Sequence, residues 1–235
     1  MSINYDDFCW GPISTEDKSI IAEEIFTNNV YEKFNAVQEG NVVVDIGANV
    51  GAFTRSILHK NPSVVYCIEP AQKLIDILKY NTRGGNVVYV PKAILNFTGS
   101  KAKDETNNIF CTEFNERFDS ITFNDFVLEN KIERIDFLKC DCESGEYDIF
   151  TPQNFSFIRH NVRWISGEWH VWGFPDVVNR FAAFRDLYLK NQRFCVHDRY
   201  GCNITDKIFD NDFIVKYGAE LTYGAQIIIY IDYRE

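Results

Sequence analysis

The chain has 235 residues, of which 46% are hydrophobic and 25% charged, a composition typical of one globular domain rather than a disordered chain. Its formal net charge of −10 disfavours a polyanionic partner, so we expect no nucleic-acid binding. The seven cysteines are scattered, no apolar stretch is long enough to span a membrane, and no signal-peptide pattern begins the chain, so we predict a cytoplasmic protein with free thiols.

The first predicted element is a helix over residues 15–38. Ser14 and Thr15 are suitable N-cap residues, and apolar residues follow them at near-helical spacing. The adjacent acids Glu23 and Glu24 then belong to the solvated face of this helix.

From Asn41 onward, short apolar runs alternate with amphipathic segments, a pattern typical of a parallel sheet with crossover helices. We therefore predict one Rossmann-like, doubly wound α/β domain over residues 41–235, with residues 1–40 as an N-terminal helical extension. The polar, aperiodic segment 97–118 is expected to be a surface loop with one edge strand at most. The seven strands of the mostly parallel sheet are predicted at residues 41–46, 63–69, 86–91, 134–141, 162–168, 193–198 and 226–232, and the helices at 50–60, 71–82, 121–131, 146–151 and 176–191.

A glycine-containing turn follows the first strand, in the segment VVVDIGANVGAFT. Such a turn brings backbone N–H groups to a ligand at the carboxyl edge of the sheet. A dinucleotide fingerprint would need glycine where this sequence has Asn49 and Ala52. The carboxylate of Asp45 would repel phosphates but suits the ammonium and sulfonium groups of S-adenosylmethionine. Glu69 ends the second strand at the spacing where a carboxylate accepts both ribose hydroxyls, so S-adenosylmethionine is the predicted cofactor.

Further pieces of the sequence support this prediction, namely YCIEP, VPKAILNFTGS, ITFNDFVLENKIERIDFLKCDCESGEYDIF and WISGEWH. Together with the turn, from about Val42 to about His170, they resemble the FkbM-type S-adenosylmethionine-dependent methyltransferases. The most specific piece, LKCDCESGEYDIF, is similar to the family's Lys-x-Asp-x-Glu-Gly-x-Glu signature, with Ser144 in place of the usual glycine.

The resemblance implies a cofactor site in which the turn surrounds the methionine moiety, Glu69 takes the ribose and Ala93 lies near the adenine. It also implies methylation of a hydroxyl on a small molecule or a carbohydrate, while nitrogen and carbon acceptors stay open. The cofactor-binding residues expected from the turn and the resemblance are Asp45, Gly47, Ala48, Asn49, Gly51, Glu69 and Ala93.

Methyl transfer to a hydroxyl needs alignment and a base that takes the hydroxyl proton. Asp141 ends the fourth predicted strand, and Glu168 and His170 lie at the end of the fifth, so the fold brings all three to the cofactor. We predict His170 as the base, because the pKa of an imidazole is ordinarily near neutrality. No metal is predicted, although two carboxylates and one imidazole are acceptable ligands for several divalent cations.

The aromatic residues after the fifth strand, Trp169, Trp172 and Phe174, either line an acceptor pocket or pack in the core. Two other functions also stay open. One is an NAD-dependent oxidoreductase, which the turn disfavours. The other is a non-catalytic module that binds S-adenosylmethionine but releases no S-adenosylhomocysteine.

Overall fold

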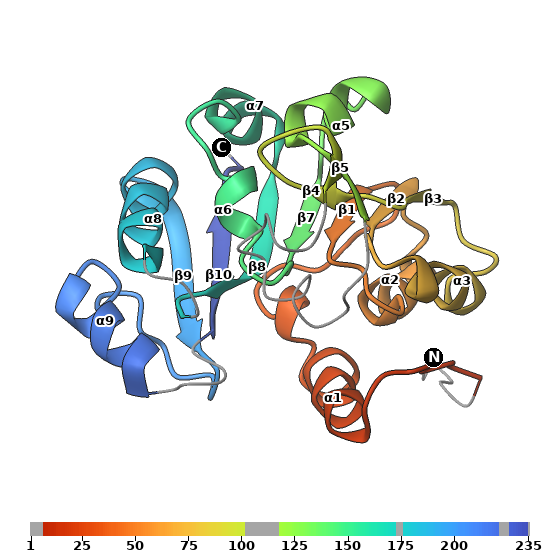
Figure 1. Cartoon of the computed structure of the whole chain (residues 1–235), viewed down its shortest axis with the longest axis horizontal. Helices are drawn as coiled ribbons and strands as arrows, with labels where there is room; N and C mark the ends of the chain where they lie inside the picture. The colour runs from red at the N-terminus through yellow and green to blue at the C-terminus, as the bar shows by residue number, and fades with distance from the viewer. Residues whose placement is uncertain (1–6, 102–117, 173–175, 221–225, 235) are drawn as a thin grey trace.

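The computed structural model describes residues 7–101, 118–172, 176–220 and 226–234. Its centre is a sheet of the strands β1 (Val42–Ile46), β2 (Val64–Ile68), β3 (Val87–Val90), β7 (Phe137–Cys140), β8 (Trp164–His170), β9 (Arg193–Asp198) and β10 (Gln226–Asp232). Their order is β3-β2-β1-β7-β8-β10-β9 (Figure 1). Neighbours from β3 to β8 are parallel, whereas β10 runs antiparallel to both β8 and β9. The predicted seven-stranded, mostly parallel sheet is confirmed.

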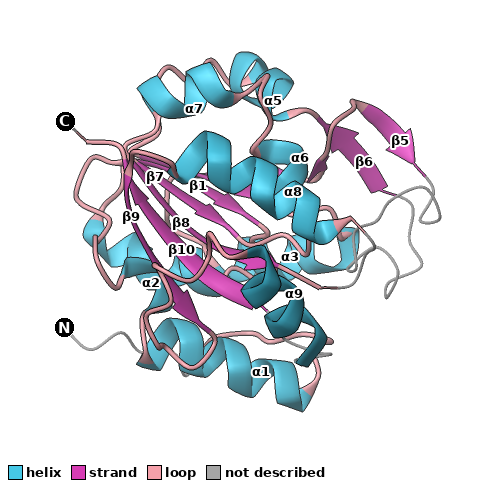
Figure 2. Ribbon diagram, turned by 90° about the vertical axis from the view of Figure 1, so that its left-hand side faces the viewer, coloured by secondary structure: helices cyan, strands magenta, loops and turns pink. Residues whose placement is uncertain are grey.

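Helices cover both faces of this sheet, and they are α1 (Thr15–Ile21), α2 (Ala52–Ile57), α3 (Gln72–Asn81), α5 (Phe123–Glu129), α6 (Glu146–Ile149), α7 (Phe155–Asn161), α8 (Val177–Phe184) and α9 (Asn211–Glu220). Figure 2 shows α5, α7 and α8 on one face, with α1 and α2 on the other. The side chains of successive β1 residues point to opposite faces of the sheet. Val44 packs in the cluster around Phe126, and Val43 packs in the cluster around Phe53. Burial on both faces explains why the strands are continuous apolar runs in the sequence.

The N-terminal segment is not the continuous helix that was predicted. After α1 come a π-helical turn at Ala22–Thr27 and a short 3-10 helix at Val30–Glu32. The break falls at Asn29, whose φ of 47° lies in the left-handed region that interrupts a right-handed helix. Beyond the break, Tyr31 is buried against Phe53 of α2, with ring centroids 5.7 Å apart. The N-terminal segment therefore packs onto the main sheet, and its division from the rest at residue 40 stays a prediction.

A second, three-stranded sheet was not predicted. It is formed by β4 (Ala93–Ile94), β6 (Phe118–Ile121) and β5 (Gly99–Lys101), in that order, and it projects beyond the main sheet in Figure 2. Strand β5 is the edge strand expected in the polar segment, while residues 102–117 of that segment lie outside the described residues.

The helices α7 and α9 were also missed, because their sequences carry weak apolar periodicity. Among the helices that the structure describes, none has both the length and the apolar composition needed to cross a membrane.

Candidate functional site

A cavity lies at the carboxyl ends of β1, β2 and β7, and we call it the turn cavity. The N-terminal segment closes one side of it with the side chains of Ile21, Glu24, Ile25 and Tyr31. Of the seven predicted cofactor-binding residues, five line the turn cavity: Gly47, Ala48, Asn49, Glu69 and Ala93. Asp45 and Gly51 do not line it.

The two glycines of the turn have structural reasons for their positions. Gly47 has a φ of +77°, and a Cβ there would lie 1.7 Å from the carbonyl oxygen of Asp141. Gly51 has a φ of +84°, and a Cβ there would lie 2.7 Å from Cδ1 of Leu78 on α3. Gly47 thus lets the turn approach the end of β7, whereas Gly51 lets α2 pack against α3.

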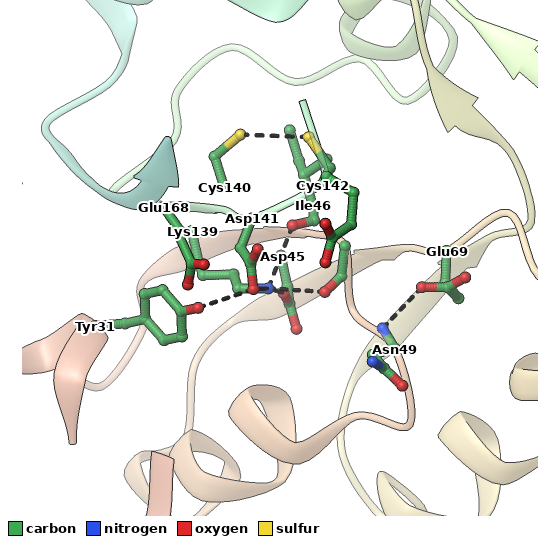
Figure 3. A network of polar contacts seen from close by, with 12 residues as sticks. Tyr31, Asp45, Ile46, Asn49, Glu69, Lys139, Cys140, Asp141, Cys142 and Glu168 are labelled. Carbon is green, nitrogen blue, oxygen red and sulfur yellow. Dashed lines mark hydrogen bonds and ion pairs between the residues drawn. The ribbon is translucent and has the colours of Figure 1, made fainter. Parts of the chain in front are cut away.

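Asp45 is fully buried beneath the turn and is already neutralised (Figure 3). The Thr54 hydroxyl donates a hydrogen bond to its Oδ2 at 2.7 Å, and Nζ of Lys139 lies 3.3 Å from its Oδ1. Lys139 also donates to the carbonyl of Gly47 at 2.7 Å. Burial by itself lowers the pKa of Lys139, but the carboxylates of Asp45 and Asp141 raise it above its ordinary value. The expected attraction between Asp45 and a positive ligand group therefore finds no support here.

Glu69 is buried at the end of β2 and faces the turn cavity. Its Oε2 accepts the N–H of Asn49 at 2.9 Å (Figure 3). Its Oε1 accepts the N–H of Ala71 at 2.8 Å. Burial raises the pKa of this carboxyl to about 7, although both N–H donors oppose the rise. Each oxygen keeps a further lone pair, as two neighbouring ribose hydroxyls would require.

The structure brings Asp141, Glu168 and His170 together, with one ligand-type atom of each within 4.8 Å of the others. Oδ2 of Asp141 accepts the Tyr31 hydroxyl at 2.9 Å and lies 3.6 Å from Nζ of Lys139. Figure 3 shows the Glu168 carboxylate beside Asp141. Asp141 lines the turn cavity, so this cluster lies at its edge.

A second cavity, which we call the polar cavity, lies between the N-terminal segment and the strands β8, β9 and β10. Its volume of about 680 Å³ is within the range of small-molecule sites. Glu168 lines it, and Glu24 lines both this cavity and the turn cavity. Its other polar and aromatic lining residues include Lys33, His197, Asp198, Arg199, Tyr200, Gln226 and Tyr230.

Glu24, like Tyr31 and Lys139, lines the site but was not among the residues predicted from the sequence. Burial, followed by the nearby Asp141 carboxylate, raises its pKa to about 7, while Lys139 and Arg199 oppose the rise. The expectation that this side chain lies on a solvated face is wrong, because the N-terminal segment packs that side of the helix onto the site. The neighbouring Glu23 is exposed, whereas Glu24 follows Ile20 by four positions and Ile21 by three, a spacing that places it on the apolar side of the helix.

His170 has surroundings that argue against its predicted role as a base. Its Nδ1 lies 3.2 Å from Oε1 of Glu146, and its Nε2 lies 3.3 Å from Oε2 of Glu143 and 3.6 Å from Oε1 of Glu168. Burial alone would lower its pKa, but Glu146 and Glu143 raise it well above the ordinary value. The side chain is also 97% buried and lines neither the turn cavity nor the polar cavity. A protonated, enclosed imidazole cannot take a proton from an acceptor.

The aromatic residues near the end of β8 were expected either to line an acceptor pocket or to pack in the core. Trp169 is fully buried and stacks on Phe184 at 4.7 Å, so it belongs to the core. Trp172 packs against the same hydrophobic cluster, and Phe174 lies outside the described residues. The core interpretation is confirmed for Trp169, and the acceptor-pocket interpretation is wrong for it.

Ser144, where the signature usually has glycine, keeps the backbone conformation that favours glycine. Its φ is 77°, and that of the preceding Glu143 is 54°. A side chain in this region costs about 1 kcal/mol or more. The substitution therefore leaves the turn into α6 intact, so that Glu143 points to His170 and Glu146 is enclosed behind it.

Comparison with known families agrees with this geometry. Residues 45–196, about two thirds of the chain, match the Methyltransferase FkbM domain. The chain belongs to the FkbM methyltransferase family. It is therefore an S-adenosylmethionine-dependent methyltransferase, as its sequence predicted.

Other comparisons add less about this FkbM methyltransferase. No curated protein matches its sequence. Among solved structures, precorrin-6y C5,15-methyltransferase from Geobacter metallireducens is 12% identical, with 98% of this chain and 96% of that chain covered and a TM-score of 0.45. Precorrin 8w decarboxylase from Methanobacterium thermoautotrophicum is 14% identical, with 94% and 91% covered and a TM-score of 0.44. At such identities and scores, neither likeness carries an argument about function.

Proposed function

We propose that this FkbM methyltransferase binds S-adenosylmethionine in the turn cavity and methylates a hydroxyl group of a small polar molecule or carbohydrate held in the polar cavity. The observation that carries the proposal is the position of Glu24, whose side chain lines both cavities. The two cavities therefore meet at a carboxylate. When bound, the cofactor supplies an electrophilic methyl group on a sulfonium.

The turn cavity offers the contacts that this cofactor needs. Glu69 presents free lone pairs to the ribose hydroxyls, and the turn from Gly47 to Asn49 exposes backbone to the methionine moiety. Ile68, Ala93 and Ile94 supply an apolar wall, which suits the adenine ring.

Glu69 gives a direct test of this placement. Glu69→Ala should weaken S-adenosylhomocysteine binding by about 1.5–3 kcal/mol, the range of hydrogen bonds to a charged group. Because only the ionised carboxylate accepts both hydroxyls, and its pKa in the free protein is about 7, affinity should fall roughly tenfold per pH unit below pH 7. Calorimetric titration of wild type, Glu69→Ala and the exposed control Glu133→Ala over this range measures both effects. Equal affinities that do not change with pH would place the ribose elsewhere.

The polar cavity has the mixed donors and acceptors that recognise hydroxyl groups. Nζ of Lys33 lies 3.1 Å from Nδ1 of His197, which therefore accepts from the ammonium and leaves its Nε2–H free to donate. Burial, followed by the Lys33 charge, lowers the pKa of His197, which keeps the ring neutral. Glu168 and Gln226 add acceptors, and the Tyr230 ring adds an apolar face.

Methyl transfer to a hydroxyl also requires a proton acceptor, and Glu24 takes this role in place of His170. With the cofactor bound, the acceptor oxygen would bond to the methyl carbon, and the electron pair of the broken carbon–sulfur bond would stay on sulfur. The hydroxyl proton passes to the Glu24 carboxylate and then to solvent.

An acceptor panel tests the reaction class. The protein is incubated with S-adenosylmethionine and with polyols, monosaccharides, nucleotide sugars, phenols or matched amines, and S-adenosylhomocysteine release is measured. We expect release with hydroxyl acceptors and a mass gain of one methyl group on oxygen. Turnover with amines alone would overturn the choice of a hydroxyl. Cofactor binding without release from any acceptor would favour a non-catalytic binding module.

A further inference from the structure

Beyond the methyl-transfer function, we infer that Asp141, Glu168 and His170 bind one divalent transition-metal cation where the turn cavity meets the polar cavity. Their ligand atoms already lie within 4.8 Å of one another. Ligands at about 2.1 Å around an octahedral ion are about 3 Å apart when adjacent and about 4.2 Å apart when opposite. The side chains therefore need only small movements to close around a cation. The inference replaces the metal-free expectation drawn from the sequence.

The first observation is the orientation of His170. Its Nδ1 lies 3.2 Å from Oε1 of Glu146, an oxygen that also accepts the backbone N–H of Cys142 at 3.0 Å. The Tyr147 hydroxyl donates to the His170 carbonyl at 2.9 Å and fixes the end of β8. This is the arrangement that metal-ligating histidines use, with one ring nitrogen held by a carboxylate outside the ligand set. The other nitrogen, Nε2, lies 3.3 Å from Oε2 of Glu143 and 3.6 Å from Oε1 of Glu168.

The second observation is the Glu168 carboxylate, whose side chain is only 7% exposed. It accepts no hydrogen bond from the described part of the chain, and its nearest positive group is Nε2 of His170 at 3.6 Å. A buried carboxylate without hydrogen-bond donors is costly, so such groups are normally paired or coordinate a metal. Asp141 uses Oδ2 for Tyr31 and Lys139, which leaves its other oxygen for the same cation.

The charges around the cluster also favour a cation. The ammonium of Lys139 is shared between two carboxylates. Its Nζ lies 3.3 Å from Oδ1 of Asp45 and 3.6 Å from Oδ2 of Asp141. The buried carboxylates of Glu146 and Glu168 both face the imidazole of His170, at 3.2 and 3.6 Å. Even a charged imidazolium leaves an excess of negative charge in this largely buried cluster. A divalent cation would offset that excess, with the histidine then acting as a neutral ligand.

The donor set indicates which cation fits. Two carboxylates suit Mn²⁺, and an imidazole extends the choice to Fe²⁺ or Zn²⁺. With three protein ligands, further positions remain for water or for an acceptor hydroxyl. Because Asp141 lines the turn cavity and Glu168 lines the polar cavity, a hydroxyl bound there would face the cofactor. The cation would orient it and make its proton more acidic, and Glu24 would remain the proton acceptor.

Mn²⁺ alone tests the inference, without any acceptor or turnover. The chelator-treated protein is titrated with Mn²⁺, and bound ion is counted by electron paramagnetic resonance and calorimetry. We expect one Mn²⁺ per chain, loss of at least tenfold in affinity in Glu168→Gln and His170→Gln, and an unchanged affinity in Glu133→Gln, an exposed acid on the surface. Glu146→Gln, which keeps all three ligands, should weaken binding by about 10- to 100-fold.

The thermal unfolding of each variant shows whether it is folded, and stabilisation by Mn²⁺ gives a second readout of binding. The inference is overturned if wild type binds no Mn²⁺ up to about 1 mM, the weak end of protein sites for divalent ions. It is equally overturned if folded Glu168→Gln binds Mn²⁺ as tightly as wild type. Neither outcome bears on Glu69 and cofactor binding, so this test is separate from that of the proposed function.

Discussion

Replacing Lys139 by methionine should lower the free energy of unfolding by about 3–5 kcal/mol, the usual cost of leaving a buried charge without its partner. The variant keeps a side chain of similar length but removes the only ion pair of Asp45 within the described chain, at 3.3 Å. It also removes the donor to the Gly47 carbonyl at 2.7 Å, so the turn should loosen. Urea unfolding at neutral pH measures the first effect, and calorimetry with S-adenosylhomocysteine measures the second.

Lys92→Met is the matched control, because Lys92 pairs with Glu129 at 3.5 Å on the surface. An exposed pair contributes at most about 1 kcal/mol, so this variant should be nearly as stable as wild type. The double variant Asp45→Asn with Lys139→Met removes both buried charges and should recover part of the loss. If Lys139→Met is no less stable than Lys92→Met, the buried pair does not stabilise the turn.

The sheet could be predicted from the sequence because a strand that is buried on both faces must be a nearly continuous run of apolar residues. Each of the seven strands is a short apolar run, and parallel neighbours need crossover helices between them. The position of Glu69 beside the turn could be predicted for a related reason, since parallel neighbouring strands end at the same edge of the sheet, while its role stays a prediction. Five of the seven expected cofactor residues accordingly line one cavity.

The rest of the site depends on contacts between distant segments. Lys139 follows Asp45 by 94 positions, and only the β1–β7 register brings them together. The pKa of His170 depends on Glu143 and Glu146, so its ordinary value was a poor guide to its role. Glu24 carried a local signal that was not used, because it follows Ile20 by four positions and Ile21 by three, which places it on the apolar side of the helix. In each case the sequence gives the residue, but it does not give the distant residues that surround its side chain in the fold.

Glu24→Gln should lower turnover by about 10²- to 10⁴-fold on whichever hydroxyl acceptor the panel identifies, because a positioned general base contributes that much. The amide has nearly the same shape and cannot take the proton. Affinity for S-adenosylhomocysteine should change little, since we propose that Glu69 and the turn supply its contacts. Steady-state kinetics should therefore show a lower kcat, with cofactor binding by calorimetry close to that of wild type.

Two further variants separate a proton acceptor from a residue that only shapes the junction. Glu24→Asp keeps a carboxylate on a shorter side chain, so it should retain more turnover than Glu24→Gln. Glu16→Gln makes the same charge change on the exposed face of α1 and should leave turnover unaltered. If Glu24→Gln turns over as fast as Glu16→Gln, the proton passes to another group. Glu168 would then be the first candidate, since among the carboxylates that line the polar cavity it is the one that belongs to the Asp141 cluster.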